Sequence, residues 1–170
     1  RGTSKFDATD GTDSPNGQFT SYLAQIQYSQ LLAERFHITA RALAQYAADP
    51  LLSIEKYALG GIKTVRGYRQ NQVVRDNAYL VSLEAHYLPE LPIWVDFIGF
   101  LDWGRGENHE DSTADGRSDL ASVGVGVVMK LSQRFSAELY LAHGFDDFKA
   151  SEYDLQDDGV HFRLEYRHAF

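Results

Sequence analysis

The sequence predicts an all-β protein, specifically an antiparallel up-and-down transmembrane β-barrel, and three observations support this. The dominant hydrophobic period is two, in segments of roughly ten residues, the length of a tilted strand that crosses a bilayer. Tyr and Phe, at 10 residues each, far outnumber Trp and Met, as is typical of strands. Short and long connections alternate between the segments, as they do in membrane barrels.

Seven segments with this period follow one another along the chain: Phe19 to Gln30, Arg35 to Ala47, Ala78 to Leu88, Ile93 to Trp103, Leu120 to Leu131, Phe135 to Phe145 and Gly159 to Phe170. Each has an apolar or aromatic face and a polar face, and aromatic residues near the ends of the apolar faces match the interfacial girdles of a barrel. Only Leu43 breaks the alternation of the second segment. A soluble β-sandwich would show the same alternation, so the connections must decide between the two.

Tight links at Leu31 to Glu34, Pro89 to Pro92 and Ser132 to Arg134 alternate with long ones at Ala48 to Asn77, Gly104 to Asp119 and Asp146 to Asp158. This order predicts short turns on one side of a membrane and long, partly acidic loops on the other. Seven strands would leave two unpaired edges in lipid. We therefore expect residues 1–170 to be the C-terminal portion of a larger barrel, with residues 1–18 forming a loop.

Composition excludes several other classes of protein. The net charge of −8 and the pI near 5.1 argue against a nucleic-acid partner, since phosphate binding needs clustered Lys and Arg. With no cysteine the chain has no disulfide framework and no thiolate metal site. No run approaches the roughly 18 apolar residues that a membrane helix requires.

The long connection at residues 48–77 is unusual because it combines apolar and basic residues. Ile62, Val65 and Tyr68 would have little reason to lie in a loop outside the cell, so we expect this loop to fold back into the barrel lumen. Gly60, Gly61 and Gly67 would supply positive φ or close backbone approach at its tip. The lumen faces of the strands offer carboxylate partners for its arginines: Glu84, Asp96, Asp102 and Glu138. Solvated loop charges at Arg66 and Arg69 are the alternative interpretation.

Two motifs carry a resemblance to a known family. The first runs from Gln45 to Gly61 and continues in Val65-Arg66-Gly67-Tyr68-Arg69, a VRGY motif. The second, of the form F-x-D-x-G, is Phe100-Leu101-Asp102-Trp103-Gly104. Together and in this order they resemble the two-partner secretion transporters of the Omp85 superfamily, in the hemolysin-activator (ShlB/FhaC/HecB) branch. The resemblance covers essentially the whole chain.

The resemblance implies a barrel of about sixteen strands, of which this chain holds the last seven, in the outer membrane of a Gram-negative bacterium. It also implies two periplasmic POTRA domains and a plug helix, which this chain does not contain. The motif loop would reach into the lumen, where Arg66 contacts Asp102, with Glu84 as a second possible acceptor. The implied function is secretion and activation of a large exoprotein, with outer-membrane lipids and the barrel-assembly machinery as further partners.

The alternating pattern of the last segment resembles the C-terminal signal that the assembly machinery reads, carried by Phe162, Leu164, Tyr166 and Phe170. A plain lipid-facing strand is compatible with the same pattern. Two other functions stay open. One is an Omp85-type factor that assembles or inserts barrels, and the other is a small, self-contained ligand-binding or enzymatic barrel.

No catalytic residues, metal site or cofactor are expected. His109, Glu110 and Asp111 lie in a polar loop without an H-E-x-x-H helix, and residues 154–159 lack the spacing of a calcium loop. His37, His86 and His161 on polar strand faces are interpreted as hydrogen-bonding residues of the lumen. Ser122, Gly124 and Gly126 share one face, where they would either leave room for the inward loop or let the strand bend.

Overall fold

The computed structural model describes residues 19–108, 117–145 and 158–168, and these residues form an all-β structure. The strands are β1 (Ser21–Ala33), β2 (Phe36–Ala47), β3 (Tyr57–Leu59), β4 (Val73–Arg75), β5 (Asn77–Tyr87), β6 (Trp94–Glu107), β7 (Arg117–Lys130), β8 (Phe135–Gly144) and β9 (Val160–Tyr166). The seven predicted segments are confirmed as β1, β2 and β5 to β9. In the described part of the chain, no helix has the length and apolar character to cross a membrane.

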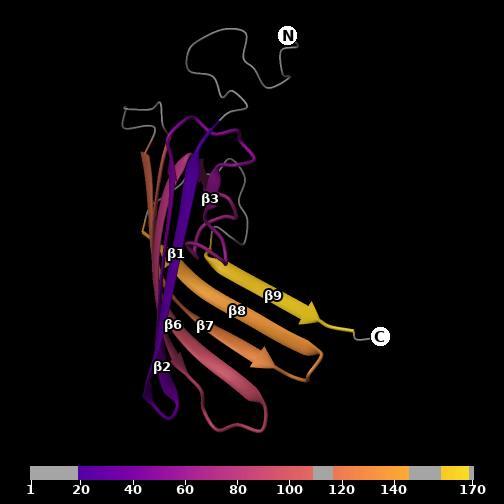
Figure 1. The fold of residues 1–170 in the computed structure, drawn as a ribbon. Helices are drawn as coiled ribbons and strands as arrows, with labels where there is room; N and C mark the ends of the chain where they lie inside the picture. The colour runs from indigo at the N-terminus through magenta and orange to yellow at the C-terminus, as the bar shows by residue number, and fades with distance from the viewer. Residues whose placement is uncertain (1–18, 109–116, 146–157, 169–170) are drawn as a thin grey trace.

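Seven strands form one antiparallel sheet in the order β1-β2-β5-β6-β7-β8-β9, so every long strand pairs with its neighbour in sequence. This is the up-and-down order that the alternating connections predict. β1 and β9 form the two edges of the sheet. The direction of the strands changes steadily from β1 to β9, which gives a curved sheet with the β2–β5 connection on its concave side (Figure 1).

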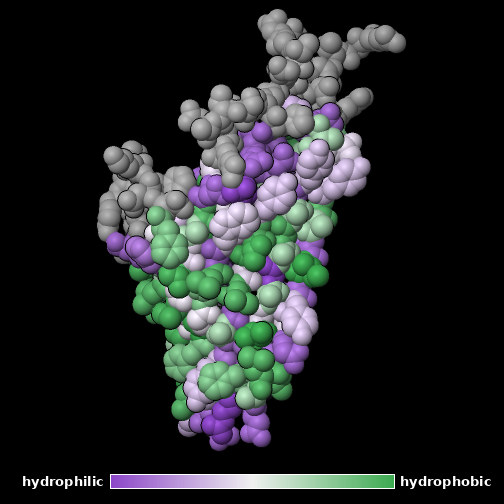
Figure 2. Space-filling model, turned by 90° about the vertical axis from the view of Figure 1, so that its left-hand side faces the viewer, coloured by the Kyte–Doolittle hydropathy of each residue, from purple (hydrophilic) through white to green (hydrophobic). Residues whose placement is uncertain are grey.

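The convex, outer face of the sheet is apolar. Its exposed side chains include Tyr28, Phe36, Tyr79, Val81, Leu83, Phe97, Leu101, Leu139, Phe162 and Leu164. They form a broad hydrophobic band with hydrophilic residues at both ends (Figure 2). An apolar surface of this extent is unusual on a soluble protein, and it matches the lipid-facing band of a membrane barrel.

The strand ends differ from the prediction in three places. β6 and β7 run past Trp103 and begin before Leu120, pairing as far as Glu107 with Arg117, so the connection predicted at residues 104–119 is too long. The added residues are polar or glycine and therefore lack the apolar alternation on which the prediction rests. At the turn between β1 and β2, the pairing extends to Ala33 with Phe36, which leaves a tighter turn than predicted. β9 ends at Tyr166, and Phe170 lies outside the described residues.

The β2–β5 connection contains a short hairpin, β3 paired with β4, which sequence analysis missed because three residues per strand show no period. Apolar residues of the connection form the main core with residues of the sheet: Leu43, Leu59, Val65, Tyr68, Val73, Ala78, Leu80 and Leu120. Leu43 thus breaks the alternation of β2 because it faces inward, against the connection. This packing holds the connection against the inner face of the sheet.

Leu83→Arg, in the middle of β5, tests whether the outer face lies in lipid. Leu83 is 45% exposed on the apolar band. A charge there should destabilise the protein folded in vesicles, lowering its free energy of unfolding by about 2–4 kcal/mol. Ile54→Arg is the control, since Ile54 is exposed but lies in the connection, outside the sheet. Urea titration of the full-length protein in lipid vesicles would measure both. Equal, small effects would contradict a lipid-facing position.

Candidate functional site

The connection at residues 48–76, called the inner loop below, is held at its base by Asp76. The backbone N–H of Leu51 donates to Asp76 Oδ1 at 3.0 Å, and the ammonium of Lys56 lies 3.2 Å from the same oxygen. From β2, the amide of Gln45 donates to the carbonyls of Glu55 and Asp76. The two ends of the inner loop are thereby fixed to each other and to the sheet.

Glycines set the course of the inner loop beyond the hairpin. Gly60 and Gly61 have φ of 103° and 99°, and an added Cβ on Gly60 would stand 2.4 Å from the carbonyl oxygen of Arg69. Gly67 has φ of 90° and lies against Ala142 of β8. The positive φ expected at these three positions is confirmed. Other residues would be strained there, so the tip of the inner loop has a defined shape.

Arg66 extends from this tip to the inner face of β6. Its Nε and Nη2 donate to the two carboxylate oxygens of Asp102 at 2.7 and 2.8 Å, and its backbone N–H donates to Oδ2 at 3.1 Å. Ser82 of β5 completes the arrangement, since its hydroxyl donates to Asp102 Oδ1 at 2.6 Å. Arg66 is 3% exposed, so this is a buried, bidentate ion pair.

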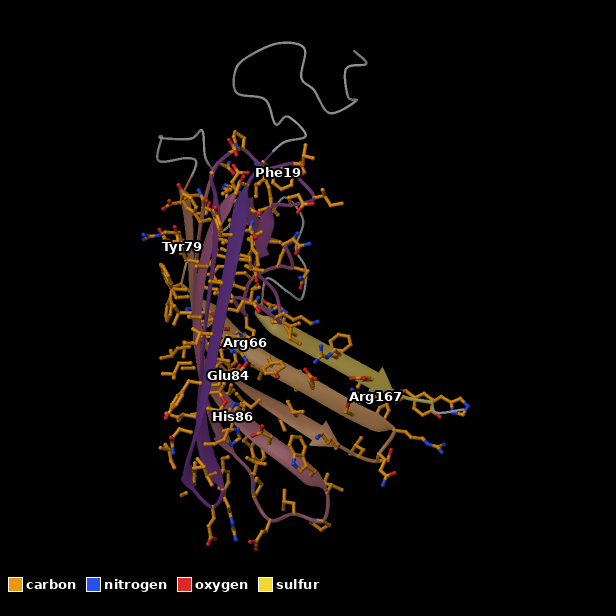
Figure 3. The ribbon with its side chains drawn as sticks, viewed as in Figure 1. Phe19, Arg66, Tyr79, Glu84, His86 and Arg167 are labelled. Carbon is orange, nitrogen blue, oxygen red and sulfur yellow. The ribbon has the colours of Figure 1, made fainter. Side chains whose placement is uncertain are left out.

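Glu84 of β5 is a second carboxylate partner, with Oε1 2.7 Å from Nη1 of Arg66. Burial lowers the pKa of the Arg66 guanidinium, but the hydrogen bonds and charges of Asp102 and Glu84 raise it by more. The pKa of Arg66 therefore lies above its ordinary value, and the side chain stays charged in the interior. Figure 3 shows Arg66 and Glu84 on the inner side of the sheet, with Tyr79 on the opposite side.

Aromatic rings cover the flat face of the guanidinium. The Phe100 ring centre is 3.6 Å from Arg66 Cζ, and the Tyr140 ring centre is 5.4 Å away. Both rings need space on β7, because a Cβ on Gly124 would stand 2.4 Å from Phe100 and a Cβ on Gly126 would stand 2.3 Å from Tyr140. The small residues of β7 thus make room for the aromatic rings that flank Arg66.

The F-x-D-x-G motif now has a physical explanation, because β6 directs its alternate residues to the inner face. Phe100 contacts the guanidinium, Asp102 binds it, and Gly104 leaves room for the inner loop. A Cβ on Gly104 would stand 2.8 Å from Val65 Cγ2 and 3.4 Å from Leu59. Val65 is itself completely buried. The two motifs therefore supply the two partners of one contact between the inner loop and β6.

Residues next to Arg66 attach the inner loop to the far side of the sheet. The N–H of Gly67 donates to Nε2 of His161 on β9 at 3.0 Å. The hydroxyl of Tyr68 donates to the carbonyl of Ala121 on β7 at 2.7 Å, and its ring lies against Gly144 at the end of β8. The inner loop consequently contacts every strand from β5 to β9. Arg69 is half-buried, with its carbonyl beside Gly60.

The structure does not bring every candidate residue to Arg66. Of the four carboxylates offered by the lumen face, Asp102 and Glu84 bind Arg66, whereas Asp96 contacts His86 and Glu138 pairs with Arg163. On β9, Phe162, Leu164 and Tyr166 are exposed on the outer face. The polar loop at His109, Glu110 and Asp111 falls outside the described residues, as does most of the segment 154–159.

Sequence analysis missed Ser82 and Tyr140. The alternation along each strand could have placed both residues on the inner face. It could not have predicted that either of them contacts the Arg66 site. Sequence analysis also missed that His37, His86 and Asp96 come together, because their grouping depends on the register of three strands.

The fold and the site define a class: a membrane β-barrel protein in which a loop folds inward and attaches to the barrel wall through a buried arginine. Residues 1–129 match the model of the family described as haemolysin secretion/activation protein ShlB/FhaC/HecB, and the chain belongs to that family. It is a family of two-partner secretion transporters.

Similar curated proteins are heme/hemopexin transporter proteins HuxB of Haemophilus influenzae. The protein of strain 86-028NP is 28% identical over 141 residues, and that of strain Rd is 27% identical over the same length. Each alignment covers 78% of this chain and 25% of the relative, so the chain spans about a quarter of the length of the curated relatives it matches. No solved structure matches significantly.

Gly104→Ala tests the fit between β6 and the inner loop. The added methyl group would collide with Val65, and overpacking of this kind should destabilise the docked loop by about 1–3 kcal/mol. Gly99→Ala on the same strand is a matched control, because its Cβ would meet nothing within 4 Å. Limited proteolysis of the loop in the folded, full-length protein would compare the two. Equal protection in both variants would contradict the close packing.

Proposed function

We propose that the protein is the barrel portion of an outer-membrane transporter that passes one large exoprotein to the surface of a Gram-negative cell. The observation that carries the proposal is the buried contact of Arg66 with Asp102 and Glu84, because it holds the inner loop at one place in the lumen. Membership of a secretion family supports the proposal, as does the description of the HuxB relatives as transporters.

The ion pair is better suited to positioning than to stability. Apolar side chains of similar volume often stabilise an interior as well as a buried ion pair does, whereas removal of one partner is strongly destabilising. The eight buried residues of the main core already supply apolar packing between the inner loop and the sheet. We therefore assign to Arg66 the role of specifying where and in which orientation the tip sits.

The space beside the tip suits an extended polypeptide. A cavity of about 640 Å³ lies between the inner loop and the sheet, and its lining includes Gln25, Arg41, Lys63, Glu84, Glu138 and Arg163. Polar and charged side chains of both signs can exchange hydrogen bonds with a passing backbone, and most of the remaining lining, which includes Leu43, Tyr57 and Ile62, is apolar. Conduction of this kind requires neither a nucleotide nor covalent chemistry in the barrel.

In the proposed whole protein, POTRA domains precede this barrel portion and deliver the exoprotein to it. The exposed face of β9, with Phe162, Leu164 and Tyr166, is proposed to act during biogenesis as the signal for the barrel-assembly machinery, together with Phe170. Among the described residues β9 is an edge strand of the sheet, and an alternating apolar edge strand can be recognised through its backbone.

Arg66→Ala in the full-length protein should abolish secretion while the barrel still assembles. The variant leaves Asp102 and Glu84 without their guanidinium, a loss of about 3–5 kcal/mol for the docked tip. Ile54→Ala is the control in the same loop, because the Ile54 side chain is 86% exposed. Exoprotein in the culture medium reports secretion, and heat-dependent migration on gels reports assembly. Normal secretion by Arg66→Ala would overturn the proposal.

Asp102→Asn should impair secretion more than Glu84→Gln. Asp102 accepts two guanidinium bonds, one backbone bond and one from Ser82, whereas Glu84 contacts Arg66 through one oxygen. Asp119→Asn is the matched control, since Asp119 pairs with Arg105 near the end of the strands at a partly exposed position. Secreted exoprotein would be measured for all three variants. The reverse order of Asp102 and Glu84 would refute the assigned roles.

A further inference from the structure

Below the Arg66 contact, three strands bring two histidines and a carboxylate together on the inner face. His37 of β2 stands directly opposite His86 of β5, and their rings stack at 4.2 Å with an interplanar angle of 10°. Asp96 of β6 lies beside them, and one potential ligand atom of each residue falls within 4.8 Å of the others. Figure 3 shows Arg66, Glu84 and His86 in succession along the wall.

Two atoms of this cluster are buried without a hydrogen-bond partner. His86 is 9% exposed, and its Nε2 is unsatisfied, as is Oδ1 of Asp96. The other imidazole nitrogen, Nδ1, lies 2.8 Å from Asp96 Oδ2. Oε2 of Glu84 stands 3.3 Å from Nε2 of His86. Buried polar atoms almost always have a partner, so these atoms indicate a site for one.

Charge in this region favours a cation as that partner. Three buried or half-buried carboxylates, Glu84, Asp96 and Asp102, lie on the inner face, and two of them, Glu84 and Asp102, bind the guanidinium of Arg66. Asp96 pairs with His86, which is charged only when protonated. Among the described residues no arginine or lysine pairs with Asp96, so a metal cation would balance the charge of its carboxylate.

We propose that His37, His86 and Asp96 bind a divalent transition-metal ion of the zinc class. Imidazole and carboxylate ligands suit zinc, whereas calcium and magnesium prefer oxygen alone. Two donors on a tetrahedral zinc ion, each roughly 2.0 Å from the metal, stand about 3.3 Å apart. His86 Nδ1 and Asp96 Oδ2 lie 2.8 Å apart, so a small movement would let one ion bind both. Glu84 Oε2 faces the other imidazole nitrogen, Nε2, at 3.3 Å, where a carboxylate can orient a metal-bound histidine.

Isothermal titration of the full-length protein with zinc chloride tests this site. The protein carries no histidine tag, is held in detergent and is first treated with a chelator. One zinc ion should bind per chain, and His37→Ala and His86→Ala should each weaken binding by about tenfold or more. His143→Ala is the control, because His143 is exposed on the outer face of β8, beside Phe145. Cobalt(II) should give a visible absorption band in the wild type that is lost in both cluster variants.

Heat-dependent migration on gels verifies that each variant is folded. His37 is only half-buried and does not contact Arg66, so His37→Ala decides the question if His86→Ala fails to fold. Absence of saturable zinc binding in the wild type would overturn the proposal. Equal zinc affinities of the His37→Ala and His143→Ala variants would overturn the proposal as well.

Discussion

The structure depends on one guanidinium taken out of water. Because Arg66 is almost fully buried, its donors require acceptors and its flat faces require contacts. β6 supplies Asp102 as the bidentate partner and Phe100 as the ring beneath it. The glycines of β6 and β7 then follow from steric need, since larger residues would displace either the inner loop or the rings that flank Arg66. A single buried cation thus accounts for the small residues on two strands that would otherwise favour bulkier ones.

Three glycines and Asp76 set the path by which the inner loop reaches this contact. Positive φ at Gly60, Gly61 and Gly67 fixes the path of the tip, and Asp76 fixes its base. Tyr68 and Gly67 then extend the attachment to β7 and β9. Packing of apolar residues would tolerate small shifts of the loop, whereas a bidentate pair does not, because its hydrogen bonds depend on direction as well as distance. Positioning is therefore the property that the ion pair adds to an already apolar core.

The sequence predicted the seven long strands because each has one face in an apolar environment, which imposes a period of two. Where that environment ends, the period ends as well, so the extensions of β6 and β7 were missed. The β3–β4 hairpin was missed because three residues per strand show no period. Arg66 and Asp102 were expected to meet because the motifs resemble those of a family and because strand parity puts Asp102 on the polar face. Tyr140 and the grouping of His37 with His86 were not foreseen, since both depend on the register across strands. Turn geometry sets that register, and spacing along one strand does not.

Glu84 connects the two polar groups of the inner face. Its Oε1 contacts Arg66 and its Oε2 faces His86, so one carboxylate belongs both to the loop contact and to the histidine cluster. Asp102 has no such second partner among the described residues, because its other contact is the hydroxyl of Ser82. A change in the charge of the cluster would therefore reach Arg66 through Glu84 while leaving the Asp102 bonds intact. The cluster can therefore affect only one of the two carboxylate contacts of Arg66, the contact with Glu84. Asp102 is the fixed part of the attachment of the inner loop, and Glu84 is the adjustable part.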